Sequence, residues 1–97
     1  MLPYYLYPMR GAVYTEHFER ELRSIEPDEI AADEFMRGAE WVLCRNPYFG
    51  TQIAPSSSVW FLPTTDIDLA VDAPDLAIYY TFDETNVYFL SIQKALG

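Results

Sequence analysis

The side chains that most often carry out nucleophilic or acid–base chemistry are scarce in this sequence. Cys44 is the single cysteine and His17 the single histidine. Cys44 falls near the C-terminal end of a predicted helix, the end that least stabilises a thiolate, and nothing in the sequence ties it to His17. We interpret Cys44 as a half-buried structural thiol and His17 as a surface residue. One cysteine also excludes an intrachain disulfide, and one Cys with one His excludes structural zinc ligation, so we expect a reducing, cytoplasmic compartment.

Carboxylates gather between residues 64 and 75, where Asp66, Asp68, Asp72 and Asp75 occur. A calcium loop of the common kind also needs a central glycine and a terminal glutamate at fixed spacing, and neither is present. We therefore interpret residues 64–75 as a solvated acidic loop and expect no metal. The four glycines stand alone, so no glycine-rich phosphate motif exists and no cofactor is expected.

Aromatic side chains form the third group with chemical potential, because many fall on predicted strands. Proteins that bind single-stranded nucleic acid stack bases on such side chains, but they also hold the phosphates with basic residues. Residues 46–97 contain a single base, Lys94, and six acids. We therefore expect these aromatics to pack in the core or against a protein, with Trp60, Tyr79 and Tyr88 as candidate partner-binding residues. An exposed aromatic sheet face would also suit a homodimer.

Length and composition define one small, acidic domain. The chain has 97 residues, of which 51% are apolar and 16% aromatic, enough for one packed core. Its formal net charge of −9 disfavours direct binding to nucleic acid or to an anionic membrane. No segment approaches the roughly 20 apolar residues that span a bilayer.

The chain begins with residues 1–8, which hold two prolines and three tyrosines and are predicted to be extended. They form an N-terminal extension to a single domain of residues 9–97. Two interpretations stay open: a loose appendage, or an ordered strap whose tyrosines cover apolar surface.

Helical periodicity follows a short predicted strand over residues 9–14. Thr15 is the predicted N-cap of a first helix, with Phe18, Leu22 and Ile25 on one face. After Pro27 a second helix shows the clearest apolar stripe, and Asn46-Pro47 ends it. That stripe consists of Ala32, Phe35, Met36, Ala39 and Leu43. Three i,i+4 ion pairs are predicted on the solvent side: Glu16–Arg20, Glu19–Arg23 and Asp33–Arg37.

The second half of the chain is predicted to form strands. Residues 59–62, 76–82 and 87–92 are the strand segments, with a hairpin loop over 83–86 and a weak edge strand over 51–54. Alternation places Ile78, Tyr80 and Phe82 on one face and Tyr79 on the other. The order is β-α-α-β-β-β, an α+β fold with a helical hairpin packed on one face of an antiparallel sheet.

This pattern resembles the RelE/ParE superfamily of type II toxins. Residues 18–22 resemble the first helix of such toxins, and residues 32–43 with Asn46-Pro47 and Gly50 resemble the second helix and its exit. Residues 77–82 and 87–92 resemble the paired final strands, so the resemblance covers about residues 9–95.

The resemblance implies a toxin held inactive by a cognate antitoxin, typically a basic or amphipathic helix. RelE-type members cleave mRNA on the ribosome with basic residues on the sheet, and ParE-type members inhibit DNA gyrase. The family has an arginine just before the Ile-x-Tyr motif of its penultimate strand, and that position is Ala77 here. Its lysines on the preceding strand fall within the apolar residues 60–62. Its arginine at the end of the last strand falls near Ala95, where Lys94 is the only base nearby. We therefore expect a toxin-like protein that acts by protein–protein contact, without RelE-type cleavage.

Two alternatives stay open. One is a non-toxic adaptor or self-associating module on the same fold. The other is a divergent ribosome-dependent mRNA endonuclease, for which Tyr80, Lys94 and Arg45 are the candidate catalytic residues.

Overall fold

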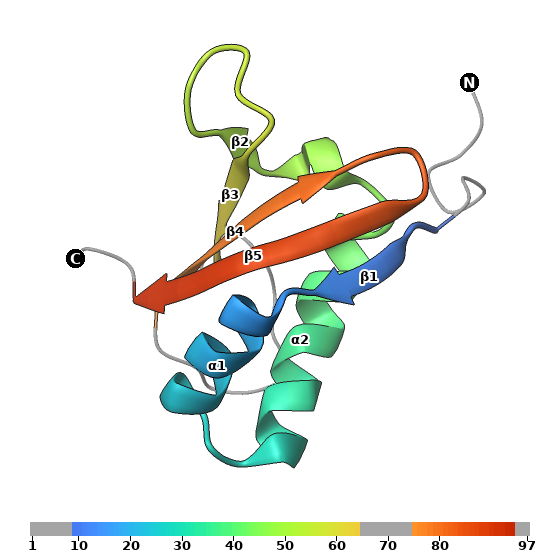
Figure 1. Cartoon of the computed structure of the whole chain (residues 1–97). Helices are drawn as coiled ribbons and strands as arrows, with labels where there is room; N and C mark the ends of the chain where they lie inside the picture. The colour runs from blue at the N-terminus through green and yellow to red at the C-terminus, as the bar shows by residue number, and fades with distance from the viewer. Residues whose placement is uncertain (1–8, 65–74, 95–97) are drawn as a thin grey trace.

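The computed structural model describes residues 9–64 and 75–94. The predicted extension over residues 1–8 and nearly all of the predicted acidic loop lie outside these ranges. Two helices and a five-stranded sheet form the α+β fold that was predicted (Figure 1). In chain order the elements are β1 (Gly11–Tyr14), α1 (Glu16–Ile25), α2 (Glu29–Leu43), the 3-10 turn η2 (Pro47–Phe49), β2 (Thr51–Gln52), β3 (Trp60–Pro63), β4 (Leu76–Phe82) and β5 (Asn86–Lys94).

The sheet has the strand order β1-β5-β4-β3-β2, and it is mixed rather than antiparallel. Its last four strands in the chain pair antiparallel, as predicted, and the weak edge strand exists as β2. β1 instead pairs in parallel with β5, with Gly11 opposite Asn86 and Tyr14 opposite Phe89. Hairpins fix the direction of strands that follow one another, whereas the direction of a strand paired across more than 70 residues leaves no local signal.

Thr15 caps α1 and ties it to the sheet. Its hydroxyl oxygen accepts a hydrogen bond from the N–H of Phe18 at 3.2 Å, and the hydroxyl donates to the carbonyl oxygen of Phe89 at 2.9 Å. Phe18 is fully buried one turn later, with its ring 5.5 Å from that of Phe89. The cap, the first buried residue and β5 therefore form one unit, which holds a helix that is too short to be stable alone.

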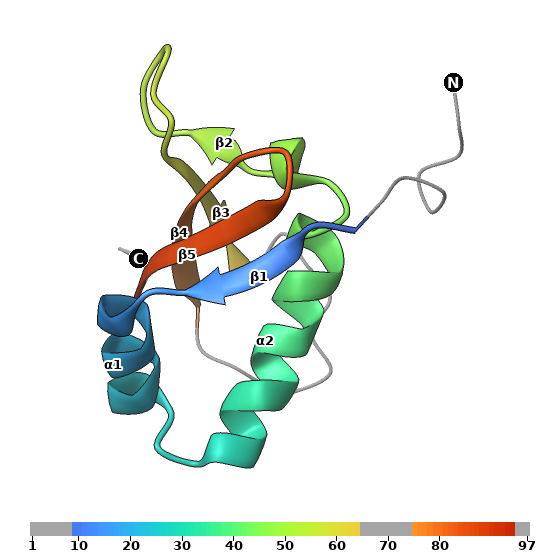
Figure 2. The ribbon, with the colours of Figure 1, turned by 45° about the vertical axis from the view of Figure 1, so that its right-hand side comes forward.

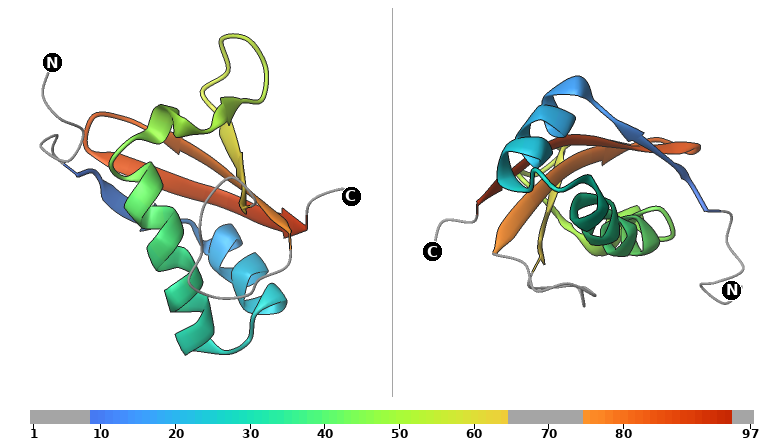
Figure 3. Two further views of the ribbon diagram at one scale, coloured as in Figure 1. Left: turned by 180° about the vertical axis from the view of Figure 1, so that it is seen from behind. Right: turned by 90° about the horizontal axis from the view of Figure 1, so that it is seen from below.

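α2 begins at Glu29 rather than directly after Pro27, because Asp28 lies outside the helix as its N-cap. The Asp28 carboxylate accepts from the N–H groups of Ile30 and Ala31 at 2.9 and 3.3 Å. The predicted apolar stripe is confirmed, since all five of its residues are buried. The stripe faces the sheet, and Figure 3 shows α2 crossing that side of the sheet when the molecule is seen from behind.

The predicted ion pairs on the helices are not formed. Within the two described stretches, the one acid–base contact at 4.0 Å or less joins His17 to Glu21, at 3.1 Å along α1. The i,i+4 spacing brings side chains near one another, but exposed pairs gain little energy against the entropy of holding two long side chains in place. The arginines of both helices therefore lack carboxylate partners at that distance among residues 9–64 and 75–94.

One core cluster joins both helices to β3, β4 and β5. The predicted alternation on β4 is confirmed for Ile78 and Tyr80, which are fully buried, while Tyr79 faces the other way. On β5 the register shifts: Tyr80 lies opposite Phe89 but Tyr79 lies opposite Ser91. The extra residue restores the inward direction for Ile92, so the bulge keeps both ends of β5 in the core.

Candidate functional site

The face of the sheet away from the helices presents aromatic side chains and no base. Phe61 lies opposite Tyr79, with 6.2 Å between the ring centroids, and Tyr88 lies opposite Thr81. All four are partly exposed. Strands β2, β3 and β4 contain neither Lys nor Arg, and β5 contributes only its final residue, Lys94. Two of the predicted partner-binding residues, Tyr79 and Tyr88, therefore lie on this open face.

The third predicted partner-binding residue, Trp60, lies on the opposite face. It lies opposite Tyr80 in the register. Together with Tyr48 and Phe82 it forms an aromatic trio, in which the ring centroids are 5.0 to 5.7 Å apart. Tyr48 is 64% exposed, so the trio reaches the surface beside η2. The structure thus brings Tyr79 and Tyr88 to one face and separates Trp60 from them.

Tyr80 is a buried structural residue in this fold. Its hydroxyl donates to the carbonyl oxygen of Pro47 at 2.6 Å and accepts from the N–H of Gly50 at 3.1 Å. Burial raises the pKa of Tyr80 to about 12. A phenol without exposed surface and with both hydrogen-bonding directions used is poorly placed to move a substrate proton.

The other two candidate catalytic residues lie at opposite ends of the sheet. The guanidinium of Arg45 stacks on the ring of Trp41, 3.4 Å from its centroid, just after α2 and near the β4–β5 turn. Lys94 ends β5, eight residues beyond Asn86 in that turn, which is roughly 26 Å along the strand. The structure therefore does not bring Tyr80, Lys94 and Arg45 into one constellation.

Cys44 and His17 are also apart. Cys44 is 2% exposed, and its pKa is raised to about 11 by desolvation first and then by the charge of Glu40. His17 lies on the exposed side of α1, where it contacts Glu21. Neither residue offers a nucleophile, and within the described ranges no group of three His, Cys, Asp or Glu side chains is placed to hold a metal ion.

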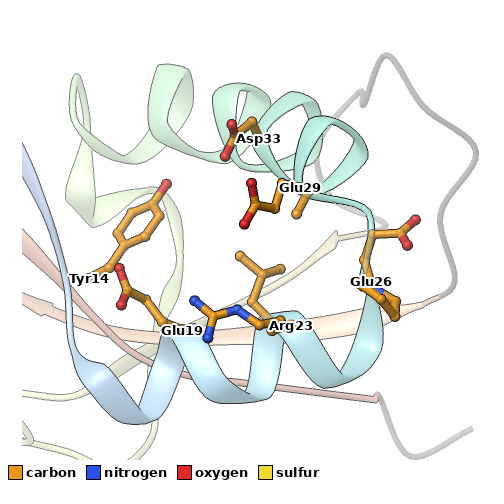
Figure 4. A pocket seen from close by; sticks show the side chains of 9 residues that line it. Tyr14, Glu19, Arg23, Glu26, Glu29 and Asp33 are labelled. Atoms are coloured by element: carbon orange, nitrogen blue, oxygen red, sulfur yellow. The ribbon is translucent and has the colours of Figure 1, made fainter.

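An acidic cleft, which was not predicted from the sequence, opens between the two helices. Its volume is about 170 Å³, and Figure 4 shows side chains from both helices facing a common space. Four carboxylates and one guanidinium line it, around a floor that includes Leu22 and Ala32. The lining residues are Tyr14, Glu19, Leu22, Arg23, Glu26, Pro27, Glu29, Ala32 and Asp33.

Tyr14 closes one end of the acidic cleft. Its hydroxyl donates to the Glu40 carboxylate at 2.5 Å, and burial together with that carboxylate raises the pKa of the Tyr14 phenol well above its usual value. The phenol therefore stays protonated and ties Glu40, in the C-terminal half of α2, to the end of β1. The sequence does show acids at i,i+4 spacing on α2, which could have indicated an acidic helix face. It does not show that these acids lie close to acids of α1, because that proximity arises only in the tertiary fold.

A second groove lies between the start of β1 and the C-terminal half of α2. Its volume is about 330 Å³. We call it the arginine groove, and its lining residues are Met9, Arg10, Gly11, Ala12, Arg37, Glu40, Trp41, Cys44 and Arg45. The spacing 37-41-45 on one helical face was a signal in the sequence, but the contribution of residues 9–12 was not predictable from it.

The fold is similar to that of one chain in the crystal structure of the RelBE2 toxin-antitoxin complex from Mycobacterium tuberculosis. The TM-score is 0.65 at 15% sequence identity, and the match covers 90% of this chain and 92% of that chain. The RelE/ParE-like fold inferred from the sequence is thereby confirmed. No model of a known protein family and no curated protein sequence matches this chain. None of the helices in the described parts has both the length and the apolar character needed to cross a membrane.

Proposed function

We propose that this chain is the toxin-like member of a type II toxin–antitoxin pair and acts by protein–protein contact. The observation that supports it most directly is the fold, which is shared along nine-tenths of the chain with a chain of a toxin-antitoxin complex. Fold alone does not specify activity, so the mode of action depends on the surfaces that this chain presents.

Contact rather than mRNA cleavage is supported by the charge of the sheet. Cleavage of RNA requires groups that neutralise the phosphate and transfer protons. The open face around Tyr79 and Tyr88 lacks Lys and Arg, Tyr80 is enclosed, and Lys94 lies far from Arg45. A partly exposed aromatic face without charge is instead typical of a protein interface.

The acidic cleft supports an antitoxin of basic, amphipathic character. Glu29 and Asp33 are exposed on α2 at i,i+4 spacing, and Glu19 faces them from α1. A helix with Lys or Arg along one side would meet these carboxylates while its apolar side contacts Leu22 and Ala32. The proposed partner therefore carries the charge that this chain lacks.

The test is inducible expression in bacteria, alone and together with the product of the neighbouring gene. We expect growth arrest alone, rescue by co-expression, and a complex that co-purifies. Absence of both arrest and complex contradicts the proposal. Incubation with translating ribosomes separates the modes of action: intact message is expected, and cleaved message contradicts action by contact.

A matched pair of variants tests the acidic cleft. Glu29→Gln with Asp33→Asn removes two cleft charges, and we expect the complex to weaken by roughly fivefold while arrest persists. Glu16→Gln with Glu34→Gln removes two exposed charges outside the cleft and serves as the control. Equal weakening by both pairs would show a nonspecific effect of net charge and contradict the cleft as the binding site.

A further inference from the structure

Among the strands of the described residues, β1 lies at a free edge of the sheet. The N–H of Gly11 donates to the carbonyl oxygen of Thr85 at 2.9 Å, and the N–H of Thr15 donates to that of Phe89 at 3.1 Å. Because backbone groups alternate in direction along a strand, residues 11, 13 and 15 bond to β5. The N–H and C=O groups of Ala12 and Tyr14 therefore point away from β5, toward the side where the sheet ends (Figure 2).

β1 has no lysine, no proline and no bulge, which are three of the features that usually block strand addition. Natural sheets protect their edges with lysine, proline, bulges or very short strands. The four residues of β1 include no charge and no proline, Ala12 is exposed, and Val13 is 38% exposed. At the opposite edge β2 has two residues, which leaves little backbone for a partner.

The arginine groove runs beside this free edge. It holds Arg10, Arg37 and Arg45, which are three of the six bases in a chain of net charge −9. None of the three has a carboxylate within 4.0 Å in the described part of the chain, and the Arg10 side chain donates to the carbonyl oxygen of Asp83 at 2.7 Å. The groove's own acid, Glu40, accepts the hydrogen bond of Tyr14. The positive charge of this acidic protein is therefore concentrated where its sheet is open.

Apolar surface accompanies the charge. Trp41 is 61% exposed although Arg45 stacks on one side of its ring, and Met9 is also 61% exposed. The backbone of Arg10 donates to the carbonyl oxygen of Cys44 at 2.9 Å, which holds the start of β1 against the end of α2. A preformed site results, with backbone, cationic and apolar contacts available to the same ligand.

We propose that the arginine groove binds an extended acidic segment of another protein, which adds to β1 as a sixth strand. The segment's backbone pairs with Ala12 and Tyr14, its carboxylates meet Arg37 and Arg45, and an apolar side chain lies on Trp41. This inference does not rest on the proposed function, because it concerns a different surface and a partner segment of opposite charge.

A peptide fits this surface better than the other anionic or symmetric occupants. Nucleic acid offers phosphates for the arginines but no backbone for the free N–H and C=O groups of β1, and the net charge repels it. A second copy of this chain docked through its own β1 would bring two arginine grooves together, which like-charge repulsion disfavours.

The test is a titration of the isotope-labelled full chain followed by amide NMR. The probe is a short peptide that alternates glutamate and valine, and its matched control alternates lysine and valine. We expect the acidic peptide alone to bind, with new exchange protection at the amides of Ala12 and Tyr14. Val13, whose N–H faces β5, is the internal control and should change little.

Two variants connect the binding to the groove. Arg37→Gln with Arg45→Gln should raise the peptide dissociation constant roughly five- to tenfold. Arg20→Gln, which removes an exposed arginine of α1 outside the groove, should change it less than twofold. Both positions in the double variant are on the surface of α2 or its end, and an unchanged amide spectrum away from the groove verifies the fold.

Specific results would overturn the proposal. One is binding of the lysine peptide with the same affinity as the acidic peptide, and another is exchange protection at the amides of Thr51 and Gln52 instead of those of β1. The others are equal effects of the two arginine variants on the dissociation constant, and no change in amide chemical shifts at millimolar acidic peptide. Tighter binding of a single-stranded oligonucleotide would assign the groove to nucleic acid. Sedimentation as a dimer that loses the response to peptide would assign the edge to a second copy.

Discussion

The hydroxyl of Tyr80 lies 2.6 Å from the carbonyl oxygen of Pro47, to which it donates a hydrogen bond. The hydroxyl oxygen of Tyr80 also accepts a hydrogen bond from the N–H of Gly50 at 3.1 Å, so one side chain on β4 fixes both ends of the turn that follows α2. Tyr80 is fully buried, and both backbone groups would lose their partner without it. The side chain that the sequence offered as a catalytic candidate thus joins the helical layer to the sheet.

Tyr80→Phe is expected to destabilise the protein by about 1–3 kcal/mol, because a buried carbonyl and a backbone N–H lose their partner. Urea unfolding followed by circular dichroism measures this difference. Tyr79→Phe is the control: its hydroxyl lies on the open face, and the change should stay within about 0.5 kcal/mol. Equal effects of the two substitutions would contradict the structural role of Tyr80.

The alkaline limb of stability should depend on Tyr80. Its pKa rises to about 12 on burial, from an ordinary value of 10. The folded state therefore keeps the proton while the unfolded state loses it, so this contribution is complete below pH 10 and is lost between pH 10 and 12. The stability difference between the wild type and Tyr80→Phe should shrink over that interval. A difference that stays constant from pH 9 to 12 would contradict the assignment.

Local patterns in the sequence were sufficient for the helices and the hairpin, but not for the surfaces between them. The N-cap at Thr15 and the stripe that ends at Leu43 are set by residues three or four apart, which periodicity detects. Gly11 pairs in parallel with Asn86, and Arg37 lines the same groove as residues 9–12. Both contacts join segments that are distant in the chain, and local patterns in a single sequence do not indicate which distant residues pair. Tyr79 and Trp60 were predicted to bind a partner together because both are aromatic, but the alternation of side chains along their strands places them on opposite faces of the sheet.

Asp83 organises the β4–β5 turn, and its titration should shape the acid limb of stability. Its carboxylate accepts from the N–H groups of Thr85 and Asn86, each at 2.8 Å, and from the Tyr88 hydroxyl at 2.9 Å. These bonds, with the Thr85 N–H first, lower the pKa of Asp83 to about 2. The stabilisation is therefore present above pH 4 and is lost as the pH falls from about 4 to 2.

Asp83→Asn should lower the melting temperature at pH 7 and flatten the decline in stability between pH 4 and 2. Thermal unfolding at a series of pH values measures both effects. Glu84→Gln, a change at the neighbouring exposed acid, is the matched control and should leave the acid limb unchanged. The same acid limb in both variants would show that Asp83 is not the group responsible.

Thr15→Val should destabilise the protein by about 1–2 kcal/mol, since it keeps the side-chain shape but removes the N-cap of α1. The loss includes the bond from the Thr15 hydroxyl to the carbonyl oxygen of Phe89, so the effect should exceed that of an isolated cap. Chemical unfolding measures it, with Ser24→Ala at an exposed position of α1 as the control. A change below about 0.5 kcal/mol would contradict the coupling of the cap to β5.

Gly50→Ala should be among the most destabilising small substitutions in this chain. A Cβ at Gly50 would lie 2.6 Å from the carbonyl oxygen of Phe61 and closer still to the Tyr80 hydroxyl, so backbone of β3 or the Tyr80–Pro47 bond has to move. Overpacking of this kind costs about 1–3 kcal/mol. Gly11→Ala is the matched control, because its Cβ would meet the exposed end of the Asn86 side chain, which can rotate away. Urea unfolding of the two variants should therefore give a clearly larger loss at position 50. Equal losses would mean that the close approach of Gly50 to Tyr80 and Phe61 does not constrain the turn.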